Sequence, residues 1–431
     1  MSGFRKVLWA AVALYSLFHL GYSLVRYSTI GLVNEDLNRY GNMVEWKSDA
    51  SGLLDTDAVL HPPFYYLFLL TLNRIFGGGA QEIGYFFYFL QFLLFPLAIY
   101  FMVQAASERP RPVHYLLATI LTVNFQPFLE TLALHKVEGI EFFLICLAVY
   151  LFRKKRDSLA GTAVALATHM KYLPGILLVH FLWKRAWKVL LGAGITMLII
   201  GVLSCAAFGI KKVAATSVRH PLDMIFSQKY EGTRPEASVE LQSLSGTINR
   251  WMAQPVPPMS FMDYIRRETY MPVAHPRRAS LIALFLKLWL TGLWFLFFHK
   301  HRASHREGEP WPSSLLEFAL SLVMIVVLVQ SFRVHYGILL LPAFVWTGIL
   351  LFEKWNLSRV QEKALFAAAY VLSAMLIPGG LLNRLPPHPV WGQEYSRHYL
   401  WLSLPFYGYL LLGLSILLFD LRLTPQGPQH E

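Results

Sequence analysis

Residues 153–185 read RKKRDSLAGTAVALATHMKYLPGILLVHFLWKR, an apolar stretch with basic clusters at both ends. Basic clusters beside apolar spans mark cytoplasmic loops, so both ends are expected on the cytoplasmic side. A single straight helix cannot begin and end on one side of a membrane. Pro174 removes a backbone donor and biases Leu173 away from the helical region, so a break at residues 171–174 would let the chain enter and return. The sequence predicts a re-entrant helix pair over residues 159–183.

Two polar residues lie beside this break. Lys171 is its first residue, and His169 comes two residues earlier. Irregular backbone at membrane depth is tolerated only where it lines protein or a wet cavity, so both side chains are expected to face the interior on the external side. The alternative is a snorkelling Lys171, whose ammonium reaches the interface. Because ionisable groups are costly in a bilayer, we treat both residues as functional-site hypotheses.

The composition indicates an all-α, polytopic membrane protein. Of the 431 residues, 55% are hydrophobic and only 15% are charged, which is typical of a chain with many spans. Apolar runs continue almost to the end, so residues 1–431 are expected to form a single membrane-embedded domain. The net charge of +12 comes from short basic clusters between apolar runs, which indicates topology and not a nucleic-acid partner.

Taking each basic cluster as cytoplasmic predicts about ten full spans with both termini inside. They are expected near residues 8–27, 82–104, 113–130, 137–152, 188–209, 281–299, 313–331, 336–353, 363–379 and 399–420. The first is expected to be retained, because it is as long as a span and lacks a clear cleavage site. Residues 64–76 are too short for a span and follow Pro62-Pro63, so an external half-helix is expected there.

Two long loops are expected outside. Residues 28–81 hold the first carboxylates and the half-helix, and residues 210–280 are polar and rich in proline. Long loops escape the charge rule, so the basic residues of the second loop do not count against this placement. We expect it to form a partly ordered cap.

The acidic segment Asn34-Glu35-Asp36-Leu37-Asn38-Arg39-Tyr40 follows the first span. Asp36 is expected to share a helical face with Arg39 and Tyr40, at spacings of three and four residues. A positioned carboxylate can remove the proton of an acceptor hydroxyl that attacks an activated carbon, with no metal. The alternative is a solvated acidic loop, and a shift of one residue in register would exchange Asp36 for Glu35.

The segment from Ser331 to Tyr336 lies between two strong spans, on the same expected face as the acidic loop and the break. Arg333 can bind a phosphate by forked hydrogen bonds, and His335 can donate a proton or a hydrogen bond. Lys171 would hold the same phosphate from the opposite wall while negative charge builds on it. The alternative for His335 and Tyr336 is an ordinary interfacial anchor.

Three further residues are second-tier candidates. His61, before Pro62-Pro63, is as consistent with architecture as with chemistry. Glu138 and Glu141, near an external turn, are as consistent with a satisfied buried polar network. The sequence contains no nucleotide-binding glycine loop, no Cys/His metal pattern and no Gly-x-Ser-x-Gly elbow, so neither a nucleotide donor nor a metal site is expected.

Together these motifs resemble the polytopic type-C (GT-C) glycosyltransferases, and most closely glycosyltransferase family 87. The carriers of the resemblance are Glu35 to Tyr40, His61-Pro62-Pro63, Ala160-Gly161 through Lys171-Tyr172-Leu173-Pro174, and His335-Tyr336 followed by Pro342. The resemblance covers nearly the whole chain. It implies a GT-C-like fold and an inverting transfer of mannose or arabinofuranose from a polyprenyl-phosphate carrier to a lipid or glycan acceptor. The expected location is the external face of the inner, cytoplasmic membrane.

The resemblance also implies roles for residues. The family's loop aspartate, acting as base, falls on Asp36, and its donor-phosphate contacts fall on Lys171 and His335. The lipid-linked sugar is a substrate, and no cofactor is implied. Where many members carry Gly-Gln-x-Asn, this chain has Glu138-Gly139-Ile140-Glu141. Amides and carboxylates offer different donors and acceptors to hydroxyls, so this departure leaves the sugar open.

Two other classes of function stay open at this point. A lipid or solute transporter or flippase would also place broken helices and charges in the membrane, but it predicts related halves with corresponding breaks, and only the break near Pro174 is found. A non-catalytic lipid-binding or assembly protein would leave Asp36, Lys171 and His335 individually replaceable. The acceptor and the oligomeric state do not follow from the sequence.

Overall fold

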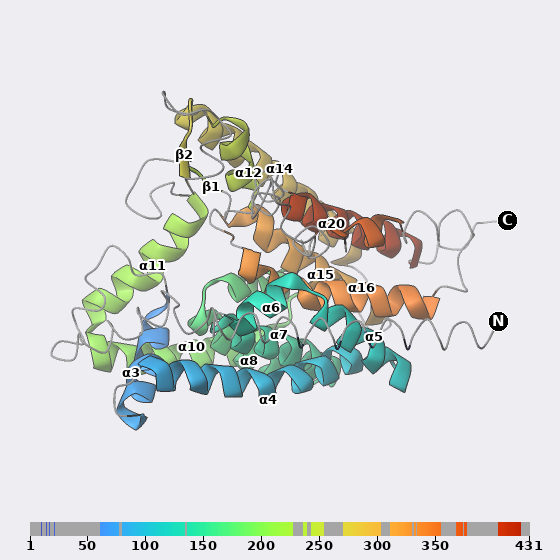
Figure 1. The fold of residues 1–431 in the computed structure, drawn as a ribbon. Coiled ribbons are helices and arrows are strands. Elements are labelled where there is room, and N and C mark those ends of the chain that lie inside the picture. Colours follow the sequence, from blue (N-terminus) through green and yellow to red (C-terminus); the bar gives the residue numbers. More distant parts are fainter. Residues whose placement is uncertain are drawn as a thin grey trace.

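The computed structural model is almost entirely helical (Figure 1). The structure describes residues 61–76, 80–133, 136–226, 236–238, 243–253, 270–302, 311–329, 332, 334–354, 368–373, 375–376 and 404–423, with Ala10, Leu14, Leu17 and Gly21. The predicted base, Asp36, and its alternative, Glu35, lie outside these residues, as does Arg333. Nearly all of the predicted first span and much of the predicted span 363–379 also lie outside them.

The helices and strands follow one another along the chain as follows. They are α3 (Pro63–Ile75), α4 (Ala80–Ala106), α5 (Pro112–Val123), α6 (Gln126–Ala133), α7 (Glu138–Arg153), α8 (Asp157–Met170), the short 3-10 helix η2 (Leu173–Gly175), α9 (Ile176–Trp183), α10 (Trp187–Phe208), α11 (Ile210–Phe226), β1 (Glu236–Ser238), α12 (Leu244–Trp251), β2 (Tyr270–Pro272), α14 (Pro276–Arg302), α15 (Trp311–Leu328), the 3-10 helix η4 (Val334–Leu340), α16 (Leu341–Lys354) and α20 (Leu404–Leu423).

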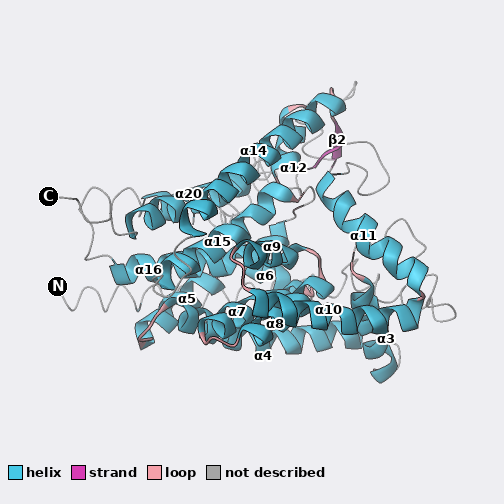
Figure 2. Ribbon diagram, turned by 180° about the vertical axis from the view of Figure 1, so that it is seen from behind, coloured by secondary structure: helices cyan, strands magenta, loops and turns pink. Residues whose placement is uncertain are grey.

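The helices lie in two groups. One group contains α3, α4, α7, α8 and α10, and the other contains α12, α14, α15, α16 and α20 (Figures 1 and 2). A continuous apolar core, with Phe142 and Trp346 among its fully buried members, joins the two groups. From the end of α10, α11 runs obliquely towards the small antiparallel sheet in which Ala237 of β1 pairs with Met271 of β2 (Figure 1).

Four helical segments of the described chain are long and apolar enough to cross a membrane. They are Glu82–Ala106, Trp187–Phe208, Pro276–Phe297 and Tyr336–Glu353. Each coincides with a predicted span, so the expectation of an all-helical protein with several apolar spans is confirmed. The full number of spans stays a prediction. So does the external position of residues 210–280, which contain α11, α12 and the sheet.

The predicted span over residues 113–130 is not one continuous helix. The structure has two shorter helices there, α5 and α6, with a break at Asn124 and Phe125. The Asn124 side-chain amide donates to the Ile120 carbonyl at 2.8 Å, and the Asn124 backbone N–H donates to the same carbonyl at 3.2 Å. The side chain therefore takes part in closing α5, and Pro127 follows in the first turn of α6, where a missing backbone donor costs little.

The predicted break at residues 171–174 is confirmed. Helix α8 ends at Met170, and Lys171 takes an extended backbone with φ −156° and ψ 145°. After η2, α9 runs back along the bundle: its Phe181 ring lies 5.1 Å from that of Phe152, at the end of α7. Because α8 begins just after α7, at Asp157, the end of α9 lies near the start of α8. Helices α8, η2 and α9 therefore form a broken helical hairpin.

The entering arm of this hairpin packs very closely against α10. A Cβ atom on Gly161 of α8 would lie 1.9 Å from the backbone oxygen of Val189, and one on Gly192 of α10 would lie 2.2 Å from that of Ser158. Small residues allow helix backbones to approach in this way within membranes. The two glycines therefore fix where α8 lies against α10.

The predicted half-helix is present as α3. It begins at Pro63, in the first turn, where proline fits without losing a helical hydrogen bond. Tyr65, Tyr66, Leu69 and Leu72 are buried and form the smaller apolar cluster with residues such as Phe87 of α4. The 13 residues of α3 are short of the roughly 20 needed to cross a bilayer core.

Candidate active site around the helix break

Lys171 lies at the centre of a buried polar cluster. Its ammonium Nζ is 2.6 Å from Glu138 Oε1 and 3.7 Å from the centre of the Tyr336 ring. Only 3% of the residue is exposed, which excludes the snorkelling alternative for this side chain. An ammonium buried this far is stable only when it is paired, and Glu138 with the face of Tyr336 supplies the pairing.

This cluster joins three distant parts of the chain. Glu138 is the first residue of α7, Lys171 closes α8, and Tyr336 belongs to η4. The extended backbone at Lys171 turns its side chain out of the helical path, and the 3-10 turns of η4 bring Tyr336 to it. The backbone of His335 also lies in η4, whereas the position of its side chain is not described. Lys171 therefore meets the segment that holds His335 through the ring of Tyr336.

A second carboxylate lies one helical turn along α7. Glu141 is fully buried and lies three residues after Glu138, on the same face of the helix. Among the described residues, neither of its carboxylate oxygens has a hydrogen-bond partner. Glu141 interacts electrostatically with Lys171 and with Glu138. One ammonium therefore faces two carboxylates in this part of the structure.

The start of α7 is held in place by Gln91 of α4, a residue that sequence reasoning missed. The Gln91 Nε2 atom donates to the backbone carbonyl of Lys136 at 2.5 Å. A Cβ atom on Gly139 would lie 2.8 Å from Gln91 Cγ, so glycine leaves room for this amide. A glutamine inside an apolar run was the available signal, since polar groups within spans usually have partners.

His61 and His169 link α3 to the break. His61 Nδ1 lies 3.4 Å from the Met170 carbonyl, and the His61 ring stacks on Tyr65 at 4.1 Å between centroids. The His169 ring meets Phe64 edge-on at 6.3 Å, and its buried Nε2 has no hydrogen-bond partner among the described residues. Both histidines therefore lie beside the break, as the sequence predicted for His169.

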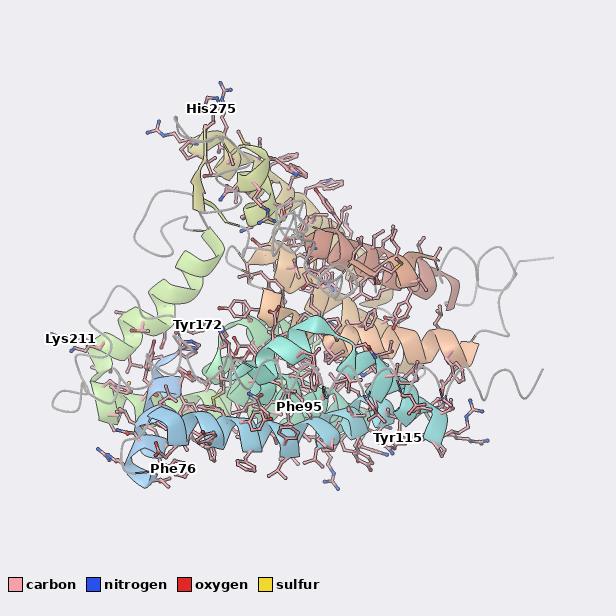
Figure 3. The ribbon with its side chains drawn as sticks, in the orientation of Figure 1. Phe76, Phe95, Tyr115, Tyr172, Lys211 and His275 are labelled. Atoms are coloured by element: carbon pink, nitrogen blue, oxygen red, sulfur yellow. The ribbon has the colours of Figure 1, made fainter. Side chains whose placement is uncertain are left out.

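The hydroxyl group of Tyr172 connects the break to α11. It donates to the Thr216 carbonyl at 3.3 Å, and Figure 3 shows Tyr172 on the side of the lower helix group that faces α11. The break is thus held from three sides, by α7, α3 and α11.

A second buried ion pair lies at the other end of the broken hairpin. Lys184, which caps α9, pairs with Glu317 of α15. Nearby, Ser321 Oγ donates to the Glu317 backbone carbonyl at 2.8 Å and hydrogen-bonds His180 Nδ1 at 2.9 Å. In the sequence, Lys184 stands out only as part of the basic cluster that ends residues 153–185. Glu317 is a lone glutamate inside the apolar run of α15, and this could have indicated that it pairs with a buried cation.

The described residues contain no group of three or more His, Cys, Asp or Glu side chains that could hold a metal ion. What the break offers is a fixed cation, an aromatic face and two carboxylates in an environment shielded from water. Charged groups act more strongly on a bound substrate in such a low-dielectric site than in solution.

Comparisons with known proteins give one family match. The model of glycosyltransferase family 87 matches residues 60–331, a range that includes Glu138, Lys171 and Glu317. Among solved structures, the crystal structure of ArnT from Cupriavidus metallidurans bound to undecaprenyl phosphate is similar, with 17% identity and a TM-score of 0.39 over 97% of this chain and 78% of that one. No curated protein matches the chain.

Proposed function

The chain belongs to glycosyltransferase family 87, and we propose that it transfers a sugar from a polyprenyl-phosphate carrier to a lipid or glycan acceptor at the external face of the cytoplasmic membrane. Mannose or arabinofuranose is the expected sugar, and the transfer is expected to invert the anomeric centre. The observation that carries the proposal is the contact between Lys171 and Tyr336, 3.7 Å from Nζ to the ring centre. It joins the helix break to the segment that holds His335.

The proposed reaction is a direct displacement. The oxygen of an acceptor hydroxyl forms a bond to the anomeric carbon while the bond from that carbon to the phosphate oxygen breaks. Polyprenyl phosphate leaves with the bonding electron pair, and the hydroxyl proton passes to a carboxylate base. Negative charge therefore builds on the phosphate, where a fixed cation lowers the energy of the transition state.

Lys171 is the proposed contact for that phosphate. An ammonium has three N–H donors. Glu138 lies 2.6 Å from it and the Tyr336 ring centre 3.7 Å from it, so we propose that a remaining donor contacts the phosphate. Glu138 is then the residue that orients the ammonium. Arg333 and His335 are proposed to bind the same phosphate from the η4 side, and His61, His169 and Tyr336 to line the site.

Asp36 is the proposed base, with Glu35 as the alternative. Replacing Asp36 by Asn keeps the size of the side chain and removes its basicity, so transfer should fall by roughly 10²–10⁴-fold. The purified variant should keep the thermal unfolding midpoint of the native protein and its affinity for the donor. Glu35→Gln is the matched control and should retain activity; full activity in Asp36→Asn together with loss in Glu35→Gln would reverse the assignment.

The experiment that tests the function uses the full-length protein in liposomes. Radiolabelled polyprenyl-phosphate mannose and polyprenyl-phosphate arabinofuranose are supplied in parallel, with a lipid extract of the native host as the acceptor source. Transfer of label from one donor to a larger lipid or glycan is expected, with polyprenyl phosphate released in equal amount. Release of free polyprenyl phosphate without labelled product, or no reaction with either donor, would refute the proposal.

A further inference from the structure

Glu141 is the buried charged group that the proposed reaction leaves unused. Its residue is fully buried, and neither carboxylate oxygen has a hydrogen-bond partner in the described chain. A carboxylate in such a place is costly, because it loses its hydration without gaining a replacement. Buried polar groups without partners are rare in folded proteins, and each calls for an explanation.

The ammonium of Lys171 does not explain why the carboxyl group of Glu141 is buried. Lys171 interacts electrostatically with Glu141, but its ammonium makes its direct contacts with Glu138, at 2.6 Å, and with the ring of Tyr336. The close pair of Lys171 and Glu138 has no net formal charge. Glu141 therefore contributes two further carboxyl oxygens that can accept hydrogen bonds from a ligand.

We propose that Glu141 binds hydroxyl groups of the sugar carried by the lipid-linked donor and thereby selects which sugar is transferred. This inference rests on the proposed function and adds to it the residue that recognises the transferred group. Hydroxyls are the donors that suit a carboxylate acceptor, whereas a phosphate would be repelled by it. The donor would lie with its phosphate on the Lys171 side of the cluster and its sugar on the Glu141 side.

The rigid setting of Glu141 suits this role. Gln91 holds the turn before α7 through the Lys136 carbonyl, and Glu138, one turn earlier, is fixed by its ion pair. A carboxylate on a helix that is held at this point keeps its oxygens in place before the substrate arrives. Pre-organised acceptors discriminate strongly, because a sugar lacking the matching hydroxyl leaves the buried carboxylate unpaired.

The test compares native protein with Glu141→Gln and Glu141→Ala in liposomes, using whichever of the two labelled donors supports transfer, and its monodeoxy analogues. Both variants should raise the KM for the intact donor by roughly 10- to 100-fold, since a hydrogen bond to a charged group is lost. Inhibition by polyprenyl phosphate without a sugar should be unchanged. For the analogue that lacks the recognised hydroxyl, native protein and variants should transfer at similar rates.

Thermal unfolding in detergent gives an independent readout. Because the variants remove a buried carboxyl group whose oxygens have no hydrogen-bond partner in the described chain, Glu141→Gln should unfold at the same temperature as the native protein or higher. Equal weakening of donor and of bare polyprenyl phosphate, or a lower unfolding temperature in Glu141→Gln, would overturn the inference and make Glu141 structural. If the native protein transfers and both variants match it, the inference fails while the proposed function stands. No transfer by the native protein would refute both.

Discussion

The broken hairpin of α8, η2 and α9 carries a buried lysine–glutamate pair near each of its ends. Lys171 pairs with Glu138 at the break, and Lys184 pairs with Glu317 where α9 finishes. All four residues are buried, and a count of ion pairs would treat the two alike. Their surroundings are different, and that difference separates a candidate site from a structural clamp.

Aromatic rings pack near the pair at Lys184, and Ser321 and His180 are its polar neighbours. The ring of His180 lies 4.3 Å from that of Phe318, and the Phe181 and Phe318 rings lie 5.3 Å apart. Here an ion pair joins two helices that already pack against each other. The pair at Lys171 has a second carboxyl group, that of Glu141, and the ring of Tyr336 as neighbours, with His61 beside Met170.

We infer that the additional polar groups near Lys171, and not its ion pair alone, distinguish the end of the hairpin that is proposed to bind the substrate. A buried pair can often be replaced by apolar residues without loss of stability, while removal of one partner is strongly destabilising. Where the pair serves only to join helices, apolar replacement should restore the protein completely. Where it serves chemistry, the same replacement should restore the fold and not the activity.

The largest effect is expected from Lys171→Met. The variant leaves Glu138 and Glu141 buried without a cation, so unfolding free energy should fall by about 3–5 kcal/mol and transfer by roughly 10²–10³-fold in the folded fraction. Thermal unfolding in detergent and the liposome transfer assay measure the two losses. In the double variant Lys171→Met with Glu138→Leu, stability should return and activity should not; recovery of both would mean that Lys171 only joins helices.

Lys184→Met should lower the unfolding free energy as much as Lys171→Met does, but it should not lower the rate of transfer. Glu317 would be left buried and unpaired, and the expected cost is again about 3–5 kcal/mol. Transfer per folded molecule should stay within about threefold of native, because the polar cluster at the break is untouched. Lys184→Met combined with Glu317→Leu should regain both stability and activity. A persistent, large loss of transfer in that double variant would show that the two ends of the hairpin are not separable.

A smaller effect is expected from Gly161→Ala. This variant tests whether close packing against α10 fixes the position of α8. The added methyl would lie 1.9 Å from the Val189 oxygen, so α8 must move away from α10 at a cost of roughly 1–3 kcal/mol. Gly194→Ala, where nothing lies within 4 Å of the added atom, is the matched control on α10 and should be neutral or slightly stabilising. Equal unfolding temperatures for the two variants would contradict the close packing.

The smallest effect is expected from Ser321→Ala. It removes the hydroxyl that hydrogen-bonds His180 Nδ1 at 2.9 Å, and a net loss of about 1 kcal/mol is expected. Unfolding in detergent should detect the change, while transfer should be native. A loss of activity with no loss of stability would place this end of the hairpin in the reaction as well.

The broken hairpin and the half-helix could be predicted because local chemistry dictates them. Pro174 lacks a backbone donor between two basic clusters, and Pro62-Pro63 begins a run too short to cross a bilayer. The burial of Lys171 was expected for the same reason, since a break within a span must face protein. Asp36 and Arg333 stay predictions, because they lie outside the described residues.

The partners of the two lysines could not be predicted, because pairing is decided by tertiary packing. Glu138 and Glu141 look alike in the sequence, yet only Glu138 reaches the ammonium of Lys171. Lys184 looked like a solvated topological charge until Glu317 of α15 proved to lie beside it. The break at Asn124 was missed because the apolar pattern continues through it, and a side chain that caps a helix leaves no mark on hydrophobic periodicity.

The two ion pairs can form at different times during biosynthesis, because their partners lie at different distances along the chain. Translation runs from the N-terminus, so Glu138 is already present when Lys171 is made, whereas Lys184 is made long before Glu317. Lys171 can therefore pair with Glu138 as soon as the break is made, whereas Lys184 cannot pair with Glu317 until α15 has been made. A chain released before α15 should hold the break in place and leave α9 loosely inserted. The ion pair between Lys184 and Glu317 can thus form only after α15 has been synthesised.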